Sequence, residues 1–539
     1  MKRRTFLSSA AAATASGLLG GATFAPRARA SGNIPLIRED HRVVIIGSGF
    51  GGGVAALRLA QAGIPVTVLE RGKWWPTGPN ADTFPSGSNP DDRALWYGSV
   101  NPRGIYTDMT TLPGMLGLPS GPSLHAGVLE AIANPNLTVM AAAGVGGGSL
   151  VYQGMTLQPS KEVFHRVFPE AIDYKKMDRR YYRRVARMLK VETAPDELIN
   201  SPNYRASRAF AEHTERAGYS VEKIPMPIDW DFALRELNGE MKPSYTNGDC
   251  ALGVNNGGKH SVDVTYIQQA METGLVEVRA LHNVTEVART PEGQWQIEVD
   301  VTDESGTLQQ QKILTSKALI MAAGSVNTTK MLLRAKHQGR IPNLSDDLGK
   351  GWGTNGDRIF TWTSNPLSNS FGPVQGGPVI YGSKEWDNPN LANTVIQASL
   401  PPTGVDARTT MLVGFGVSDA RGRWVYDPLT NDSTLVWPRE ADWKIHQRIT
   451  QRLWEIAGPL SVLGDTHAVA PMTWHPLGGA CMETVCDLEG RVHNLPGLYV
   501  LDGALIPGST AACNPSMTIA AIAERAIDEI VKRDVGKVI

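Results

Sequence analysis

The chain has 539 residues, of which 42% are hydrophobic and 19% are charged. This composition excludes an intrinsically disordered chain, and the length exceeds that of one compact unit, so we expect two domains. The 52 basic residues nearly balance the 53 acidic ones, and five of the basic residues lie within the first 30 positions, which hold no acid. The rest of the chain is therefore net acidic, and nothing in it argues for a nucleic-acid partner.

The first 30 residues have the features of a targeting segment. Arg3-Arg4 begins a twin-arginine pattern, small residues follow as far as Ala25, and Ala28-Arg29-Ala30 is an A-x-A-like cleavage site. The stretch is too short and too weakly apolar for a membrane span. We interpret residues 1–30 as a twin-arginine signal peptide, which predicts a periplasmic or secreted protein. The alternative is an exposed N-terminal tail.

Residues 42–72 predict a strand, a tight turn, a helix and a second strand. Residues 43–46 and 65–69 are short apolar runs, and the turn between them reads Gly47-Ser48-Gly49-Phe50-Gly51-Gly52. Glu70 stands at the end of the second strand. This order is typical of a dinucleotide-binding unit.

Each of three glycines in this turn has a separate predicted role. Gly47 permits the tight turn, Gly49 lets a pyrophosphate approach the backbone, and Gly52 lets the helix pack close to the strand. The helix N-terminus would face the phosphates, and Glu70 would accept hydrogen bonds from ribose hydroxyls. An acid at position 70 disfavours NADP but does not separate NAD from FAD.

The four cysteines are too few for a disulfide framework in a chain of this length. They are Cys250, Cys481, Cys486 and Cys513. Cys481 and Cys486 could pair in an oxidising compartment, but two separate core thiols are at least as consistent with the sequence. No cluster has the spacing of metal ligands, so we predict no metal site.

The middle of the chain alternates between helical and strand-like stretches. Residues 141–150 form a second glycine-rich run, which suggests backbone held close to a flat or charged ligand. Residues 175–190 are basic with interleaved apolar residues, which favours a solvated helix over a nucleic-acid patch. The predicted strands that follow are 260–267, 276–281, 284–287, 295–301 and 318–323, with a helix at 328–335.

The last third predicts an antiparallel sheet and then a closing helix. Strand-like runs at 394–398, 410–417, 423–426 and 433–437 would form the sheet of the second domain. Asn514 precedes Pro515, and these residue types suit the cap and the first position of a helix. Apolar residues at helical spacing continue to about residue 530.

Several of these motifs together resemble the glucose–methanol–choline (GMC) oxidoreductase family, and within it the non-covalent cholesterol oxidases. The motifs lie at residues 47–52 with Glu70, 144–155, 260–267, 322–325, 349–356, 473–479, 499–507 and 514–525. They cover the chain from about residue 40 to the end.

The resemblance implies an α/β fold in which a Rossmann-like FAD-binding domain is interleaved with an α+β substrate domain built on an antiparallel sheet. The expected FAD-binding domain comprises residues 38–160, 250–345 and 465–539. The expected substrate-binding or cap domain comprises residues 161–249 and 346–464.

The resemblance also implies the site residues. His475 matches the family's active-site histidine and Asn514 its active-site asparagine. The cofactor, non-covalent FAD, would be held by Gly47, Gly49, Phe50, Gly51, Gly52, Glu70, Gly148, Tyr152, Met155, Val284, Gly503, Asn514 and Ser516. An imidazole suits the handling of a hydroxyl proton, and an asparagine can donate a hydrogen bond without adding charge.

Two positions depart from the pattern of cholesterol oxidases. Gln397 falls where those enzymes carry a glutamate that moves a proton during isomerisation, and a neutral amide cannot accept that proton at ordinary pH. Tyr152-Gln153 replaces a small Asn-Gly pair near the flavin. We therefore expect sterol oxidation with little isomerisation.

The sequence hypothesis is an FAD-dependent oxidation of an alcohol, foremost a 3β-hydroxysterol such as cholesterol, with O2 as acceptor. Transient contact with a membrane surface would give access to the sterol. One alternative is an exported dehydrogenase for another alcohol or sugar that uses a quinone or cytochrome. Another is a non-catalytic lipid-binding protein on the same fold, and an NAD-linked dehydrogenase is a weaker option.

Overall fold

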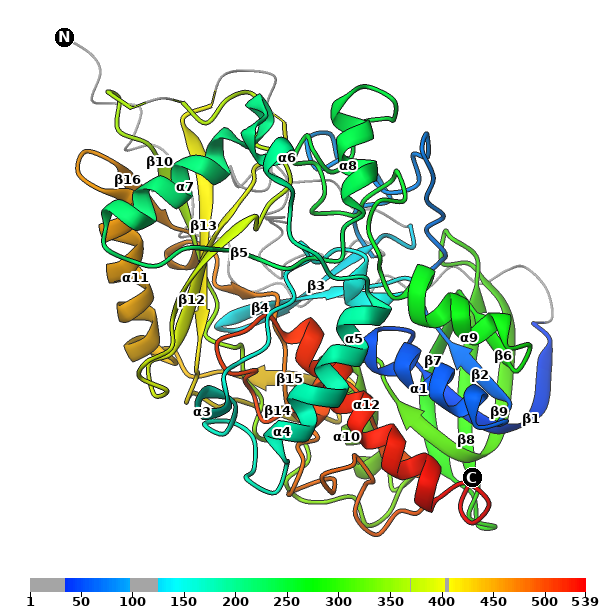
Figure 1. The fold of residues 1–539 in the computed structure, drawn as a ribbon. Helices are drawn as coiled ribbons and strands as arrows, with labels where there is room; N and C mark the ends of the chain where they lie inside the picture. The colour runs from blue at the N-terminus through cyan, green and yellow to red at the C-terminus, as the bar shows by residue number, and fades with distance from the viewer. Residues whose placement is uncertain (1–33, 97–124, 369, 403–406) are drawn as a thin grey trace.

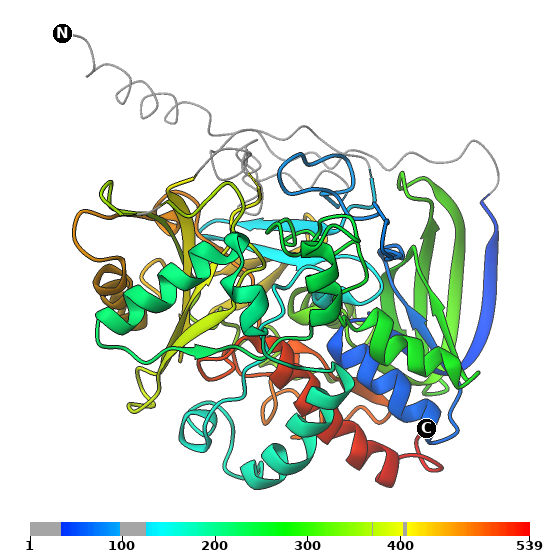
Figure 2. The same ribbon diagram turned by 45° about the horizontal axis from the view of Figure 1, so that its top comes forward.

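The computed structural model describes residues 34–96, 125–368, 370–402 and 407–539 (Figure 1). The predicted signal peptide at residues 1–30 lies outside the described residues. Two large sheets stand on opposite sides of the molecule, with the short strands β3 and β4 between them (Figures 1 and 2). This mixed α/β architecture confirms the fold class expected from the sequence.

The first sheet has the order β6-β2-β1-β9-β8-β7, with β18 also paired to β9. Its centre is β1 (Leu36–Ile46), which runs parallel to β2 (Val66–Leu69) and to β9 (Leu308–Met321). The remaining strands are β6 (Val276–Arg279), β7 (His282–Arg289), β8 (Trp295–Thr302) and β18 (Leu498–Val500). The last four residues of β1 are apolar and fully buried, because α1 (Phe50–Gln61) and α12 (Pro515–Arg533) belong to the same core.

The second sheet has the order β16-β10-β13-β12-β11-β5, and all its pairings are antiparallel. The strands are β5 (Glu222–Lys223), β10 (Arg358–Thr363), β11 (Tyr381–Glu385), β12 (Asn393–Ala398), β13 (Thr409–Gly416) and β16 (Val462–Asp465). Two helices, α7 (Arg205–Arg216) and α11 (Trp443–Ala457), share a core with one face of this sheet. The other face is left to form a cavity wall.

Shorter elements connect the two sheets. A third sheet has the order β17-β4-β3, made of β3 (Leu129–Asn134), β4 (Leu137–Ala142) and β17 (Met472–Thr473). The other helices are η1 (Gly147–Ser149), α3 (Lys161–Phe164), α4 (Tyr174–Lys176), η2 (Met177–Tyr182), α5 (Arg183–Met188), α6 (Asp196–Asn200), η3 (Pro202–Tyr204), α8 (Trp230–Leu237), η4 (Asp263–Ile267), α9 (Gln268–Glu272), α10 (Gly324–His337), η5 (Thr466–Ala468) and η6 (Gly503–Leu505).

Two expectations about secondary structure are wrong. Residues 260–267 are not a strand, because Val262, Tyr266 and Ile267 recur at helical spacing and are buried against α1, so the segment forms the π-helix η4. The predicted strands at 423–426 and 433–437 do form, as β14 (Arg423–Asp427) and β15 (Asp432–Val436). They make a separate hairpin that packs on α10 instead of joining the large antiparallel sheet.

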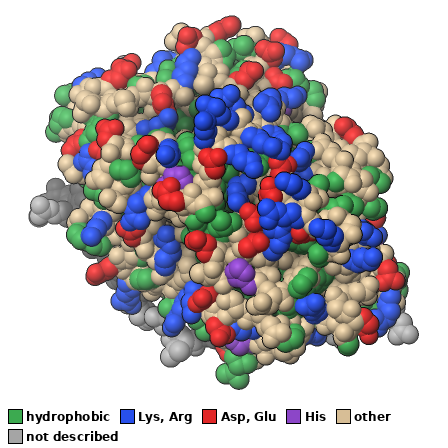
Figure 3. All heavy atoms as spheres, turned by 60° about the horizontal axis from the view of Figure 1, so that its bottom comes forward, with side chains coloured by type: hydrophobic (Ala, Val, Ile, Leu, Met, Phe, Trp, Pro, Cys, Tyr) green, Lys and Arg blue, Asp and Glu red, His purple; other side chains and the backbone are tan. Residues whose placement is uncertain are grey.

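The basic segment from residue 175 to 190 is helical and partly solvent-exposed, as expected. Its inner side chains, among them Tyr181 and Tyr182, are buried, while Arg180 and Arg184 pair with Asp528 of α12. On the face shown in Figure 3, Lys and Arg side chains gather over the middle of the molecule, with Asp and Glu side chains among them. Within the described ranges, no helix has the length and hydrophobicity that crossing a membrane requires. All four cysteines are buried free thiols, so Cys481 and Cys486 are not bonded to each other in this structure.

Candidate active site

A cavity of about 780 Å³ lies between the two large sheets and receives residues from both. One half is lined by the glycine turns and strand ends of the first sheet, and the other by side chains of the antiparallel sheet. Every predicted cofactor-binding residue except Gly52 lines this cavity. Gly52 instead lies at the contact between α1 and the first turn, where a Cβ would meet the carbonyl of Gly47. This is the packing role expected for it.

The first turn is shaped so that backbone, not side chain, faces the cavity. Gly47 has a φ of 98°, and a Cβ there would collide with the carbonyl oxygen of Ala322. A Cβ on Gly49 would meet only the Cα of Gly147 at 3.8 Å, and one on Gly148 would meet nothing within 4 Å. The two glycine-rich turns therefore leave a cradle that a ligand can fill.

The N-terminus of α1 opens into the same cradle. No side chain caps this terminus, and its first turn contains no acid. The first backbone N–H groups of a helix have no partner within the helix, and its N-terminus carries partial positive charge. A pyrophosphate fits such a position, so these residues suit a dinucleotide cofactor.

Glu70 is buried at the edge of the cradle and is held in one orientation. One carboxylate oxygen accepts hydrogen bonds from the Ser48 hydroxyl at 2.6 Å and the Ser48 N–H at 3.2 Å, and the other accepts from the Gly72 N–H at 2.9 Å. Ser48 also accepts a hydrogen bond from the Gly146 N–H at 3.1 Å, which ties the first glycine turn to the second. The carboxylate lines the cavity and retains capacity to accept from a ribose hydroxyl.

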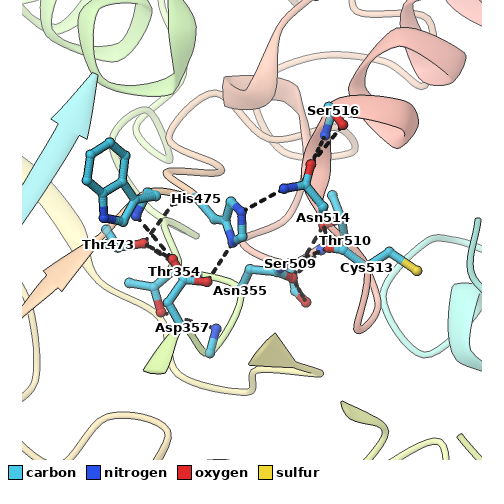
Figure 4. Close-up of polar contacts among 12 residues, drawn as sticks. Thr354, Asn355, Asp357, Thr473, His475, Ser509, Thr510, Cys513, Asn514 and Ser516 are labelled. Atoms are coloured by element: carbon cyan, nitrogen blue, oxygen red, sulfur yellow. Dashed lines mark hydrogen bonds and ion pairs between the residues drawn. The ribbon is translucent and has the colours of Figure 1, made fainter. Parts of the chain in front are cut away.

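His475 and Asn514 meet where the two halves of the cavity join (Figure 4). Asn514 Nδ2 donates to His475 Nε2 at 3.1 Å, and His475 Nδ1 donates to Asp357 Oδ1 at 2.6 Å. These contacts assign the tautomer with the proton on Nδ1, because Nε2 faces a donor and Nδ1 faces a carboxylate. The lone pair of Nε2 is thereby directed toward the Asn514 amide, and both residues line the cavity.

Asp357 is a member of the site that the sequence interpretation missed. It lies just before β10, is 5% exposed, and its second oxygen accepts from the Thr473 hydroxyl at 2.8 Å and the Trp474 N–H at 3.1 Å. The available signal was its position directly after the glycine-rich motif at residues 349–356, and the contact with His475 spans 118 positions in the sequence. A carboxylate held this way fixes the imidazole's tautomer and orientation.

Asn514 is positioned by the start of α12. Its Oδ1 accepts from the Ser516 N–H at 3.1 Å and the Ser516 hydroxyl at 2.7 Å, so the residue caps the helix as predicted. Because Oδ1 is occupied by these donors, Nδ2 is the group turned toward His475. One amide therefore serves both as the helix cap and as a donor in the cavity.

The half of the cavity beyond His475 is mainly apolar, although Ser399 also belongs to the lining. Its wall is made by Ile359, Val379, Ile396, Ala398, Met411, Val413, Phe415 and Trp474. The Phe415 ring stands edge-on to the imidazole, with 5.7 Å between ring centroids. No Asp or Glu other than Asp357 lines this wall among the described residues. The imidazole of His475 and the amide of Asn514 therefore stand beside a mainly hydrophobic surface.

The interpretation of Gln397 as the residue in place of a catalytic glutamate is corrected by the structure. Successive side chains of a strand point to opposite faces, and on β12 it is Ile396 and Ala398 that line the cavity. Gln397 lies on the opposite face, where it accepts from the Ser207 hydroxyl at 3.2 Å and donates to the Thr410 hydroxyl at 3.0 Å. It is buried between the sheet and α7 and has no place at the reacting atoms.

Tyr152 and Gln153, the second departure from the family pattern, do line the cavity. The Tyr152 ring packs edge-on against Phe50, with 5.6 Å between centroids, and burial raises the pKa of its hydroxyl well above the usual value. The phenol is therefore neutral at physiological pH and acts as part of the wall between the glycine cradle and the apolar half.

A Rossmann-like dinucleotide cradle that opens onto a buried imidazole and amide defines a cofactor-dependent oxidoreductase. Comparison with known proteins agrees with this class. Models of the GMC oxidoreductase family match residues 123–339 and 457–523, and a model of an FAD binding domain matches residues 42–74. The chain belongs to the GMC oxidoreductase family, and membership implies FAD as its cofactor.

Individual relatives agree with this assignment. A cholesterol oxidase of Mycobacterium tuberculosis is 27% identical over 91% of both chains, and one of Acinetobacter baumannii is 25% identical over 91% of this chain and 94% of the other. A long-chain-alcohol oxidase of Arabidopsis thaliana is 23% identical over 59% of this chain and 36% of its own. The solved structure of pyridoxine 4-oxidase from Mesorbium loti superposes with a TM-score of 0.60 at 13% identity, covering 91% and 99% of the two chains, which shows the shared fold.

Proposed function

We propose that this protein oxidises an apolar secondary alcohol, foremost a 3β-hydroxysterol such as cholesterol, to the ketone, with non-covalently bound FAD and with O2 as the final acceptor. The observation that carries the proposal is the position of His475 and Asn514 between a glycine cradle suited to a dinucleotide and a wall made of apolar side chains. The two cholesterol oxidases among the relatives support the choice of a sterol.

The polar groups of the site can handle the alcohol's hydroxyl group directly. An alcohol oxygen placed between His475 and Asn514 would replace their 3.1 Å hydrogen bond, because it can donate to Nε2 and accept from Nδ2. His475 then takes the hydroxyl proton on Nε2, and Asp357 stabilises the resulting imidazolium through Nδ1. Bound FAD would supply the acceptor for the hydride that leaves the carbinol carbon.

The apolar wall determines which alcohols fit this arrangement. Carbinols with a large hydrocarbon body gain burial against Ile396, Met411 and Phe415, whereas a sugar would place most of its hydroxyl groups against apolar side chains that cannot bond them. This favours a sterol over the polyol alternative. A long-chain primary alcohol satisfies the same wall and is the second candidate, supported by the long-chain-alcohol oxidase among the relatives.

We further propose that isomerisation is weak, although for a reason other than the one expected from Gln397. The strand that faces the cavity presents Ile396 and Ala398, so no carboxylate stands there to move a proton within the steroid. An ultraviolet assay that found rapid formation of a conjugated Δ4-3-ketone would contradict this expectation.

Three further properties belong to the proposal. Non-covalent attachment follows from the resemblance to the non-covalent cholesterol oxidases, and heat denaturation should release free flavin. Export of a folded holoprotein through the twin-arginine route rests on the sequence of residues 1–30. Transient contact with a membrane surface would let the enzyme extract a sterol, and binding to cholesterol-containing vesicles would test it.

Anaerobic reduction of the bound flavin is the decisive experiment. The purified holoprotein is mixed with cholesterol, hexadecanol or glucose without oxygen, and the visible absorbance of the flavin is followed. Bleaching by cholesterol is expected, and bleaching by hexadecanol alone would move the assignment to long-chain alcohols. Bleaching by glucose alone would favour the dehydrogenase alternative, and a protein that purifies and reconstitutes without flavin would favour a non-catalytic lipid-binding protein.

Acceptor profiling then separates an oxidase from a dehydrogenase. Reoxidation by dissolved O2 within the time of one turnover is expected for the oxidase. If O2 reoxidises the flavin slowly and a quinone or cytochrome reoxidises it fast, the quinone or cytochrome is the acceptor and the enzyme is a dehydrogenase.

A further inference from the structure

The second glycine-rich turn is clamped from behind by the segment that contains Lys259. The backbone N–H of Val262 donates to the Ser149 hydroxyl at 2.9 Å. Lys259 Nζ donates to the carbonyl oxygen of Leu150 at 2.5 Å and to that of Tyr152 at 3.2 Å. One neutral contact and one cationic contact therefore hold the same turn.

Lys259 is deeply buried, with 6% of its surface exposed. Its backbone is fixed by a β-bridge to Ile228, so the side chain leaves the backbone at a set position. Within the described part of the chain it forms no ion pair, and its ammonium group is solvated by the two backbone carbonyls. Burial lowers the pKa of Lys259 to about 8, which leaves the cation the main form at neutral pH.

The turn held by Lys259 is itself the wall of the cavity. Gly148, Tyr152 and Gln153 line it, and Nζ lies 5.5 Å from the centroid of the Tyr152 ring. The ammonium group of Lys259 thus lies directly behind the turn that lines the cavity. Because water screens a buried charge little, the field of this ammonium group extends into the cavity.

We propose that Lys259 is a positioning residue that locks the turn at residues 148–152 against bound FAD and stabilises the reduced cofactor more than the oxidised one. The inference rests on the proposed function, because it requires FAD in the cradle. Reduced flavin carries more negative charge than oxidised flavin, so a fixed cation nearby raises the reduction potential. Asp263 is a buried acid on the same segment that faces Gly146; it interacts with the Lys259 charge but forms no ion pair with it among the described contacts.

The test compares the full-length holoprotein with Lys259→Met and Ser149→Ala. Lys259→Met removes the cation at similar length, and Ser149→Ala removes the neutral clamp on the same turn. We expect Lys259→Met to weaken the binding of reduced FAD about tenfold more than that of oxidised FAD. That ratio corresponds to a fall of about 30 mV in the two-electron potential, measured by equilibration with a reference dye. Ser149→Ala should weaken both forms equally and leave the potential unchanged.

Several outcomes would overturn this inference. Lys259 has no electrostatic role if the reduction potential is the same in the wild type and in Lys259→Met. The same conclusion follows if Ser149→Ala lowers the potential as much as Lys259→Met does. If Lys259→Met does not fold, Lys259→Gln keeps a donor for the carbonyls without the charge and should show the same fall in potential. Loss of folding in both variants would assign Lys259 to stability alone. A wild-type protein that binds no FAD would instead refute the proposed function, which the flavin spectrum shows separately.

Discussion

The two halves of the cavity are built by different means. The cofactor half is made of backbone, since Gly47, Gly49 and Gly148 present main-chain atoms and empty space. The substrate half is made of side chains on one face of the antiparallel sheet. On β12, Ile396 and Ala398 face the cavity and Gln397 faces away from it. A backbone-built surface depends on particular glycines, whereas a side-chain wall tolerates exchange among apolar residues of similar size.

This difference indicates that substrate preference can change more easily than cofactor binding. Pyrophosphate binding needs backbone N–H groups in one geometry, so a single added Cβ disturbs it. In the proposed function, the preference for one alcohol depends on the volume and polarity of the wall, which several strands share. His475 and Asn514 lie where the two halves of the cavity meet, and each is oriented by its own set of hydrogen bonds.

The largest effect should follow from a change in the cofactor half. Gly47→Ala would place a Cβ against the Ala322 carbonyl at a φ of 98°. We expect loss of bound flavin and a fall in the free energy of unfolding of about 1–3 kcal/mol from overpacking, with backbone strain in addition. Flavin absorbance per protein and thermal unfolding measure this. Full flavin content in Gly47→Ala would contradict the view that this half depends on backbone geometry.

A change where the two halves of the cavity meet should separate flavin binding from turnover. His475→Ala removes the acceptor for the hydroxyl proton and should lower turnover by about 10³-fold while flavin content stays near that of the wild type. Steady-state rates and the flavin spectrum are measured on the same preparation. An equal loss of flavin and turnover would make His475 a structural residue of the cavity.

A smaller effect on turnover is expected at Asp357, which acts through its hydrogen bond to His475. Asp357→Asn cannot both accept from His475 Nδ1 and accept from the Trp474 N–H, because one of its two terminal atoms becomes a donor. We expect turnover to fall about 10²-fold with little change in KM, since the imidazole loses its fixed orientation. A raised KM with unchanged turnover would instead place Asp357 in substrate binding.

The smallest effect on activity is expected at Gln397. Gln397→Ala leaves the buried Ser207 hydroxyl without its acceptor and removes one donor to Thr410, which keeps its contact with Gln375, so the free energy of unfolding should fall by about 1–3 kcal/mol. Turnover and the ratio of ketone products should stay unchanged, because the side chain faces α7. Ala398→Glu is the matched variant, since it places a carboxylate on the cavity face of the same strand. A product ratio that changed in Gln397→Ala but not in Ala398→Glu would reverse this assignment of faces.

Local sequence patterns predicted much of the cofactor half. The glycine turn and the acid at Glu70 belong to one unit of about thirty residues, and the helix cap at Asn514 depends on residues two positions apart, so patterns within short segments could predict them. The segment at residues 260–267 was predicted wrongly, because its β-branched residues favour a strand while packing against α1 imposes a helix.

The sequence by itself therefore predicted the first glycine turn of the cofactor cradle, and its resemblance to the GMC family implied the histidine and asparagine that face the cradle. Only the tertiary structure decided which carboxylate orients His475, which face of β12 lines the cavity, and which buried cation lies behind the second turn. Those contacts join residues such as Asp357 and His475, or Lys259 and Tyr152, that are 118 and 107 positions apart. Their meeting depends on how the two sheets pack together, and no local pattern in the chain records that arrangement.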